Sequence, residues 1–223
     1  MELRYARNIP ALTPEECGIL RSKRVLVVGC GGLGGHIIDQ LCRIGIGFLR
    51  VVDGDVFEET NLNRQLLSEV PLLGISKATA AAEHIRRVNP EIDPEAVDAF
   101  MTEENVRELI FGCDIVIDAL DNIPGRRILS AACEMAGIPY VYGAIRGWVA
   151  QAAISVPGDH LIEKLFPEEV EIPDKSVLSF TPALCASMQT ALCVKYLVGR
   201  PVETGLICYF DLLNQEFETI PMA

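Results

Sequence analysis

The sequence predicts an α/β fold: a Rossmann-like, doubly wound and mainly parallel sheet, extended near the C-terminus by antiparallel strands. Three observations support this fold class. Short apolar runs alternate with amphipathic segments between residues 24 and 142, a glycine-rich turn follows the first run, and the alternation stops after Gly143. Alternating strands and helices are typical of a parallel sheet with helices on both faces. Because 223 residues are too few for two domains of ordinary size, we expect a single domain over 1–223.

The first part of the chain contains the parallel elements in order. Thr13-Pro14-Glu15-Glu16 has the pattern of a capping box with proline at the first helical position, which predicts a helical arm over 1–23. Glycine or an Asn-Pro pair ends three of the later helices, because neither continues a helix readily. The predicted strands cover 24–29, 47–53, 95–99, 114–119 and 138–142, and the predicted helices cover 33–44, 76–88, 103–111 and 124–136.

The last part of the chain follows a different pattern. Residues 148–156 alternate like a strand, but they follow the previous strand too closely for a crossover helix, which predicts antiparallel pairing. Residues 157–180 are rich in proline and acids without clear periodicity, and we expect them to form a crossover loop. A helix over 182–198 and strands over 205–211 and 215–220 complete the prediction.

Composition and charge narrow the classes of partner and location. The formal net charge of −12 argues against general binding to nucleic acid or anionic membrane, because both require a cationic surface. Residues 183–198 are apolar, yet they are too short for a comfortable membrane span, so we expect a core or dimer-interface helix. The N-terminus lacks the apolar segment of a signal peptide, and the eight cysteines form no C-x-x-C pair. Reduced, buried thiols are typical of the cytoplasm, and we expect a cytoplasmic protein.

The segment Gly29–Gly34 reads G-C-G-G-L-G and directly follows an apolar strand. Glycines let backbone N–H groups approach phosphate closely, and the helix that begins there adds its positive dipole end. Asp53 follows at the end of the second strand, where a doubly wound fold places a carboxylate on ribose hydroxyls. These two features alone are equally typical of a NAD-dependent dehydrogenase.

Polar residues further along the chain favour ATP over a nicotinamide cofactor. Residues 61–65 read N-L-N-R-Q, and this cation with its amides can reach a phosphate tail. Lys77 opens the next helix and supplies a second cation. Asp121 follows the fourth parallel strand, so it should lie in the crevice at the carboxyl ends of the strands and hold Mg²⁺ on phosphates.

Together these motifs resemble the ThiF/MoeB/HesA family, the bacterial relatives of ubiquitin-activating enzymes. The similarity covers most of the chain and is strong up to about residue 156. Lys77, Arg126 and the segment Gly143–Arg146 also occupy family positions. The matching motifs are R-Y-x-R at 4–7, G-x-G-G-L-G at 29–34, D-x-D followed by N-L-x-R-Q within 53–65, and D-N at 121–122.

The resemblance implies ATP-dependent adenylation of the C-terminal glycine carboxylate of a ubiquitin-like sulfur carrier protein (ThiS/MoaD-like) that ends in Gly-Gly, with release of pyrophosphate. It implies a homodimer with ATP and Mg²⁺ as cofactors, serving thiamine, molybdopterin or related sulfur transfer. Catalytic roles fall to Arg7, Arg64, Lys77 and Asp121, with Arg7 reaching the partner subunit's nucleotide and Asp121 positioning Mg²⁺. Nucleotide contacts fall to Gly29, Gly31, Gly32, Gly34, Asp53, Asp55, Asn61, Asn63, Arg64, Gln65, Lys77, Asp121 and Asn122.

The chain departs from the family in its cysteines. Many members close a structural zinc site with two C-x-x-C pairs, but residues 158–167 read G-D-H-L-I-E-K-L-F-P, and no second pair follows the last strand. We therefore predict no structural zinc. Some members keep a cysteine in the crossover loop for a covalent link to the carrier, whereas none lies between Cys133 and Cys185. Because Cys185 is expected to pack in the core, we predict adenylation without a thioester step.

Other interpretations remain open at this point. The substrate could be a tRNA base or a peptide, although the negative charge weighs against tRNA. A NAD-dependent oxidoreductase leaves Arg64, Lys77 and Asp121 without a role, and a non-catalytic scaffold leaves the phosphate-binding set without a purpose. His84 is expected on a solvated helix face, and Trp148 either in the core or in a groove for the carrier.

Overall fold

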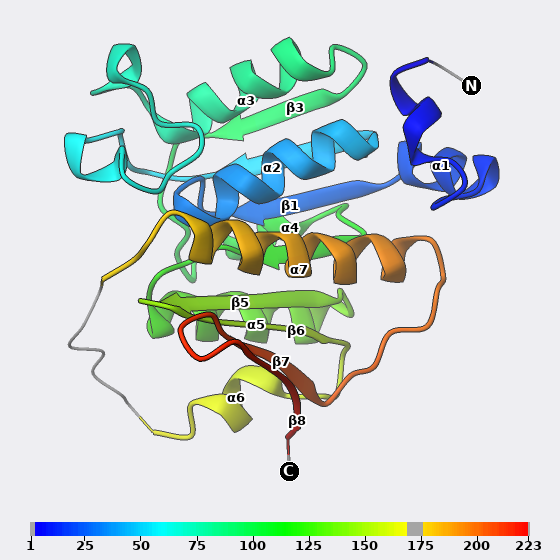
Figure 1. Cartoon of the computed structure of the whole chain (residues 1–223), viewed down its shortest axis with the longest axis vertical. Coiled ribbons are helices and arrows are strands. Elements are labelled where there is room, and N and C mark those ends of the chain that lie inside the picture. Colours follow the sequence, from blue (N-terminus) through cyan, green and yellow to red (C-terminus); the bar gives the residue numbers. More distant parts are fainter. Residues whose placement is uncertain (1–2, 169–175, 223) are drawn as a thin grey trace.

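The computed structural model describes residues 3–168 and 176–222, and one eight-stranded sheet runs through them (Figure 1). The strand order is β3-β2-β1-β4-β5-β6-β7-β8; the first five strands pair in parallel and the last three add in antiparallel fashion. This confirms the predicted fold class. The strands are β1 (Arg24–Val28), β2 (Phe48–Val52), β3 (Asp93–Val97), β4 (Ile115–Asp118), β5 (Tyr140–Arg146), β6 (Val149–Ser155), β7 (Leu206–Asp211) and β8 (Glu216–Pro221).

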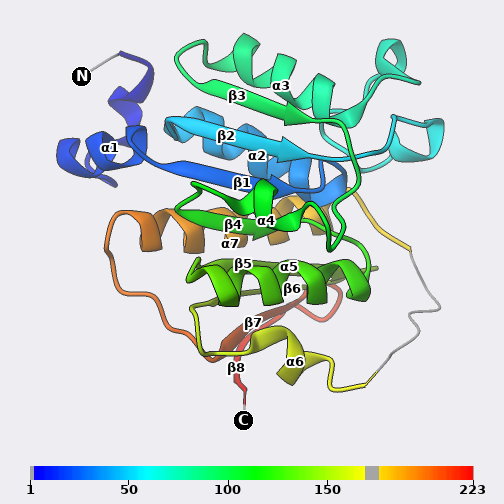
Figure 2. The ribbon, with the colours of Figure 1, turned by 180° about the vertical axis from the view of Figure 1, so that it is seen from behind.

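Helices cover both faces of the parallel strands. Figure 1 shows α2, α3 and α7 on one face, and Figure 2 shows α4 and α5 on the other. The strands bury both faces: Val25 and Val27 belong to one apolar cluster, while Leu26 and Val28 belong to the opposite one. The helices are α1 (Pro14–Arg21), α2 (Gly32–Ile44), α3 (Lys77–Val88), α4 (Val106–Ile110), α5 (Ile123–Ala136), α6 (Leu161–Leu165) and α7 (Phe180–Leu197).

The strand order creates a crevice between β1 and β4. The chain leaves β1 towards β2 on one side, and β4 lies on its other side, so the two following connections diverge. In an open α/β sheet, ligands bind at the carboxyl ends of the strands where the order reverses in this way. The segments after β1, β2 and β4 therefore meet around one space.

Some element boundaries differ from the predictions. The strand expected at 95–99 lies at Asp93–Val97, and the helix expected at 103–111 is the shorter α4. Within the predicted crossover loop over 157–180, Leu161 and Ile162 are fully buried on the short helix α6, which is too brief to show a helical period in sequence. Helix α7 begins at Phe180, and the part of the loop over 169–175 lies outside the described residues.

The two ends of the sheet carry different features. The N-terminal arm contains the 3₁₀ turn Leu3–Asn8 and α1, whose Thr13 and Glu16 form the expected capping box. This arm lies at the end of the sheet opposite to the carboxyl ends of the parallel strands (Figure 1). In the described part of the chain, no helix combines the length and the apolar character that crossing a bilayer requires.

Candidate active site

A cavity of about 320 Å³ opens at the carboxyl ends of the parallel strands. Its size falls within the range of small-molecule sites. The loops after β1, β2 and β4 and the first residue of α3 supply most of its polar wall. The predicted site residues in this wall are Gly29, Gly31, Gly32, Asp53, Asp55, Arg64, Gln65, Lys77, Asp121 and Asn122.

The glycine turn brings bare backbone to the cavity. Gly29 has φ +100°, and a Cβ at this position would lie 2.6 Å from the carbonyl oxygen of Ala119 after β4. A Cβ on Gly34 would lie 1.8 Å from the carbonyl oxygen of Gly29, so Gly34 lies outside the wall but allows the turn to close. Helix α2 starts at Gly32, and its N-terminal N–H groups and dipole favour an anion at this end.

Asp53 is fixed by the backbone around it. Its Oδ2 accepts a hydrogen bond from the Cys30 N–H at 2.7 Å, and its Oδ1 accepts one from the Asp55 N–H at 2.9 Å. Burial raises the pKa of the Asp53 carboxyl, while these two donors oppose the shift. The carboxylate is thus held in one orientation at the cavity, as recognition of a ribose diol requires.

Two cations face the same space from different elements. Arg64 follows the 3₁₀ turn Glu59–Asn61, and its guanidinium donates to the Thr60 carbonyl at 2.9 Å and to Asn63 Oδ1 at 2.8 Å. Lys77 opens α3, and its mostly buried ammonium lies 3.1 Å from Asp55 Oδ2. The Lys77 side chain therefore lines the same cavity as Arg64.

The two asparagines of the N-L-N-R-Q segment support the loop rather than line the cavity. Asn61 is buried, and its Oδ1 accepts a hydrogen bond from the Glu58 N–H at 3.0 Å. Asn63 donates through Nδ2 to the Val177 carbonyl at 3.2 Å. Both side chains therefore fix the backbone that carries Arg64, and direct nucleotide contacts by them stay a prediction.

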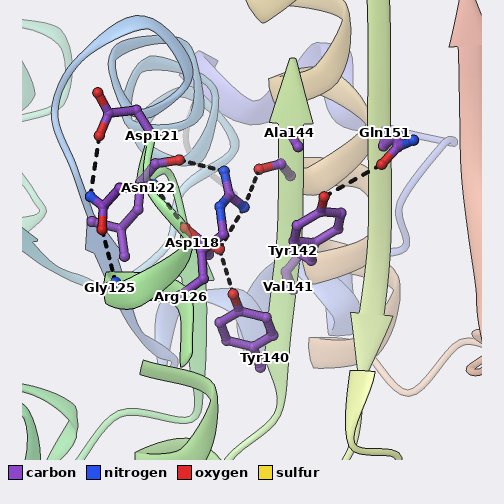
Figure 3. A network of polar contacts seen from close by, with 12 residues as sticks. Asp118, Asp121, Asn122, Gly125, Arg126, Tyr140, Val141, Tyr142, Ala144 and Gln151 are labelled. Atoms are coloured by element: carbon purple, nitrogen blue, oxygen red, sulfur yellow. Dashed lines mark hydrogen bonds and ion pairs between the residues drawn. The ribbon is translucent and has the colours of Figure 1, made fainter. Parts of the chain in front are cut away.

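Asp121 and Asn122 lie between β4 and α5 (Figure 3). Asn122 caps α5 by accepting a hydrogen bond from the Gly125 N–H at 2.8 Å, and its Nδ2 donates to Asp121 Oδ1 at 3.2 Å. The exposed Asp121 carboxylate is thereby held at the cavity wall. Carboxylate oxygens are the donors that Mg²⁺ prefers, and this side chain fits the ion.

A buried charge network supports this loop from below, as Figure 3 shows. Arg126 donates to Asp118 Oδ2 at 2.8 Å, to the Gly143 carbonyl at 2.7 Å and to the Leu120 carbonyl. Tyr140 donates its hydroxyl to the same Asp118 carboxylate. Arg126 also lines the cavity, although it was not among the predicted site residues. The sequence holds no local signal for this pair, because residues of β5 complete the network.

The apolar wall of the cavity was not predicted from the sequence. Phe100 and Met101 follow β3, Phe166 follows α6, and all three line the cavity. Gly54 allows the chain after β3 to approach, because a Cβ there would lie 2.6 Å from the Phe100 nitrogen. Residues after the third strand could have been found from the rule that ligands bind at carboxyl ends. Phe166 has no such local signal.

Arg7 lies apart from the cavity in this chain. It is exposed on the 3₁₀ turn Leu3–Asn8 in the N-terminal arm, at the opposite end of the sheet. Its predicted contact with a nucleotide therefore requires a second copy of the chain, and it stays a prediction.

The structure shows what surrounds Cys185 and His84. Cys185 is fully buried, its Sγ donates to the Gln151 carbonyl at 3.2 Å, and burial raises its pKa to about 12. This agrees with a packing role. Our expectation for His84 was wrong, because its ring is mostly covered and Nε2 lies 2.9 Å from Asp39 Oδ1 on α2. The sequence could not show that α3 packs this residue against α2.

A backbone turn for phosphate, a fixed ribose-type carboxylate and two cations around one crevice define a nucleotide-binding enzyme of the doubly wound class. The profile of the ThiF family matches residues 5–223, and the chain belongs to the ThiF family. It is an adenylyltransferase. This membership sets aside the alternative of a NAD-dependent oxidoreductase.

The comparisons also identify individual relatives. The chain is 39% identical over 228 residues to the SAMP-activating enzyme E1 of Haloferax volcanii, covering 98% of this chain and 84% of that protein. It is 32% identical over 233 residues to the sulfur carrier protein adenylyltransferase of Thermus thermophilus, covering 97% and 86%. The crystal structure of Escherichia coli MccB with ATP superposes with a TM-score of 0.84 over 100% of this chain and 72% of that one. At 20% identity, this last likeness concerns the fold alone.

Proposed function

We propose that this chain uses ATP to adenylate the C-terminal glycine carboxylate of a ubiquitin-like protein and releases pyrophosphate. The observation that carries the proposal is the convergence of the glycine turn, Asp53, Arg64, Lys77 and Asp121 on one crevice. A dinucleotide site needs the first two features but not the cations or the second carboxylate.

The reaction requires positioning and charge neutralisation rather than a base. A carboxylate oxygen of the protein substrate attacks the α-phosphorus, a new P–O bond forms, and the bond to the bridging oxygen breaks with its electron pair leaving on pyrophosphate. The nucleophile is already ionised, so no side chain has to remove a proton. Arg64 and Lys77 neutralise the charge that develops on phosphate, and the α2 N-terminus holds the phosphate oxygens.

Mg²⁺ supplies further positive charge at the phosphates when it is bound. Asp121 is the residue that would hold it, and Asn122 keeps that carboxylate at the cavity wall through its 3.2 Å hydrogen bond. Asp55 instead pairs with Lys77 at 3.1 Å and so helps to orient its ammonium.

The relatives favour a sulfur carrier as the acceptor. One is named for activating SAMP and the other for adenylating a sulfur carrier protein. We propose a ThiS/MoaD-like carrier that ends in Gly-Gly, in thiamine, molybdopterin or related sulfur transfer. Adenylation without an enzyme thioester is supported by the absence of cysteine between Cys133 and Cys185 and by the burial of Cys185. The remote position of Arg7 supports a homodimer in which this cation serves the partner subunit.

The test compares thermal unfolding with Mg-ATP, with NAD and with neither, for wild type and Arg64→Ala. Ligand at about 100 times its Kd should stabilise the fold by about 2.7 kcal/mol. We expect a shift with Mg-ATP in wild type that Arg64→Ala largely loses and the matched variant Arg107→Ala, exposed on α4, retains. Pyrophosphate exchange that depends on a Gly-Gly carrier then tests the acceptor. A shift with NAD alone, or near-normal exchange in Arg64→Ala, would contradict the proposal.

A further inference from the structure

A second group of chemically reactive side chains lies away from the nucleotide cavity, between α2 and α3. Asp39 and Cys42 are one turn apart on α2, and His84 faces them from α3. The carboxylate oxygen, Sγ and ring nitrogen that they offer all lie within 4.8 Å of one another. Within the described ranges, this is the group of three metal-ligating side chains that the fold brings together.

The donor atoms of the group lie nearly as close together as the ligands of a single zinc ion. His84 Nε2 lies 2.9 Å from Asp39 Oδ1. Zinc binds nitrogen, oxygen and sulfur donors at about 2.0–2.3 Å, which places neighbouring donors about 3–4 Å apart. The donors here are already within this range or near it. An ion at this position would replace the hydrogen bond between His84 and Asp39.

The cavity beside Asp39 and His84 offers space for a fourth ligand. A cavity of about 150 Å³ borders the group and is lined by Asp39, His84 and Glu69 among others. This space exceeds what one water molecule needs. Either the exposed Glu69 carboxylate or a water molecule can complete four-coordination from this side.

Two arginines face the same cavity and set the charge balance. Arg43 donates through Nε to Asp39 at 2.8 Å, and Arg87 lies 3.9 Å from Glu83. Both arginine side chains are largely exposed, so they can turn towards water. A hydrogen bond from Arg43 to the ligating carboxylate is also the kind of outer partner that orients metal ligands. Asp39, Glu69 and a Cys42 thiolate carry more negative charge than the two arginines carry positive charge, which favours a cation.

We propose that Asp39, Cys42 and His84 form a binding site for a thiophilic divalent ion such as Zn²⁺, with Glu69 or water as the fourth ligand. This site uses none of the positions at which the family's cysteine pairs are missing, and it does not depend on the proposed function. On binding, the Cys42 thiol releases its proton to solvent and its sulfur bonds to the metal. Burial raises the pKa of this thiol to about 12, and the charge of a bound metal ion reverses that preference.

The position of the site gives it a structural consequence. Asp39 is seven residues beyond Gly32 on α2, and His84 is seven residues beyond Lys77 on α3, which is about two helical turns in each case. An ion here therefore ties together the two helices whose first residues line the nucleotide cavity. It would hold the glycine turn and Lys77 at a constant distance from each other.

Cobalt provides a direct test, because thiolate ligation of Co²⁺ produces a charge-transfer absorption that oxygen ligands do not. The full chain is freed of metal with a chelator, kept reduced and titrated with Co²⁺, and Zn²⁺ is then added as a competitor. We expect a thiolate band at one ion per chain that Zn²⁺ removes and excess Mg²⁺ leaves, since hard cations avoid sulfur. Absence of the band would overturn the proposal.

Variants locate the site. Cys42→Ser should abolish the band, and His84→Gln should weaken Co²⁺ binding by at least about tenfold. Their matched controls are Cys193→Ser, at another fully buried cysteine, and His160→Gln, at an exposed histidine; both should bind as wild type does. If Cys42→Ser does not fold, His84→Gln decides. Wild-type affinity in His84→Gln, or an equal loss in both cysteine variants, would overturn the assignment.

Discussion

The parallel part of the sheet and its antiparallel extension present different surfaces. Most described residues of the cavity wall come from the parallel strands and the segments that follow them. Phe166, after α6, and Val177, before α7, complete the wall. Strands β6 to β8 contribute none, and instead the extension exposes large apolar side chains such as Leu213 and Phe217. The chemistry thus belongs to the carboxyl ends of the parallel strands.

Loss of the buried charge network beside the cavity should have the largest effect on the parallel part of the sheet. Arg126→Met leaves the fully buried Asp118 carboxylate without its guanidinium partner, and such a loss costs about 3–5 kcal/mol. We expect this decrease in the free energy of unfolding in urea, together with loss of Mg-ATP binding. Arg107→Met, at an exposed site, should cost little. A decrease below about 1 kcal/mol would mean that the Tyr140 hydroxyl and the Leu120 N–H satisfy Asp118 without the guanidinium.

Asp121→Ala tests the cavity without disturbing the core. The carboxylate is exposed and accepts one hydrogen bond, from Asn122, so the free energy of unfolding should hardly change. Adenylate formation, measured as pyrophosphate exchange, should fall by about 10²–10³-fold because one electrostatic contact to the transition state is lost. Glu103→Ala, at another exposed acid, serves as the control. Exchange within about twofold of wild type would remove Asp121 from the proposed mechanism.

Features that depend on local pattern could be predicted from the sequence, whereas features that depend on packing could not. Apolar runs and the glycine turn gave β1, α2 and the ribose-type Asp53, because local pattern alone determines these features. The pairing of Asp118 with Arg126 needed the fold, since Gly143 and Tyr140 from β5 complete the network. Motif positions predicted Asp121 and Lys77 at the wall, where both lie.

Other parts of the molecule could not be read from sequence in physical terms. Phe166 reaches the cavity because α6 buries Leu161 and Ile162 in the apolar cluster that also contains Leu26 and Val28. His84 appeared solvated because its partner Asp39 lies on a helix that is distant in sequence. Such contacts depend on how helices pack, and a single sequence carries no local signal for them.

Trp148→Ala tests the apolar surface near the extension. Trp148 precedes β6, is 41% exposed, and its ring centroid lies 5.0 Å from that of Phe180 at the start of α7. Truncation of an exposed aromatic anchor typically costs about 1–2 kcal/mol of binding. We expect KM for a carrier protein to rise about tenfold while the thermal shift with Mg-ATP is unchanged. Phe111→Ala, at an exposed aromatic that follows α4, is the control. Equal effects of the two variants would argue against this docking surface.

Of these variants, Asp39→Asn should have the smallest effect. It tests the contact between α2 and α3, which lies away from the cavity. Burial alone raises the pKa of Asp39, but His84 and Arg43 outweigh it and lower this pKa to about 2. The folded state therefore favours the ionised carboxylate. Its contribution to stability is present above the unfolded pKa of about 3.8 and is lost as the pH falls through about 2.

Because the pair is partly exposed, we expect the metal-free variant to be less stable than wild type by under about 1 kcal/mol near neutral pH. The gap between the urea midpoints should narrow from about pH 5 towards about pH 2. Asp98→Asn, at an exposed carboxylate, should show no such change. A gap that stays constant with pH would mean that Asp39 contributes through hydrogen-bond geometry rather than charge, because an asparagine amide cannot reproduce the contacts to both Arg43 and His84.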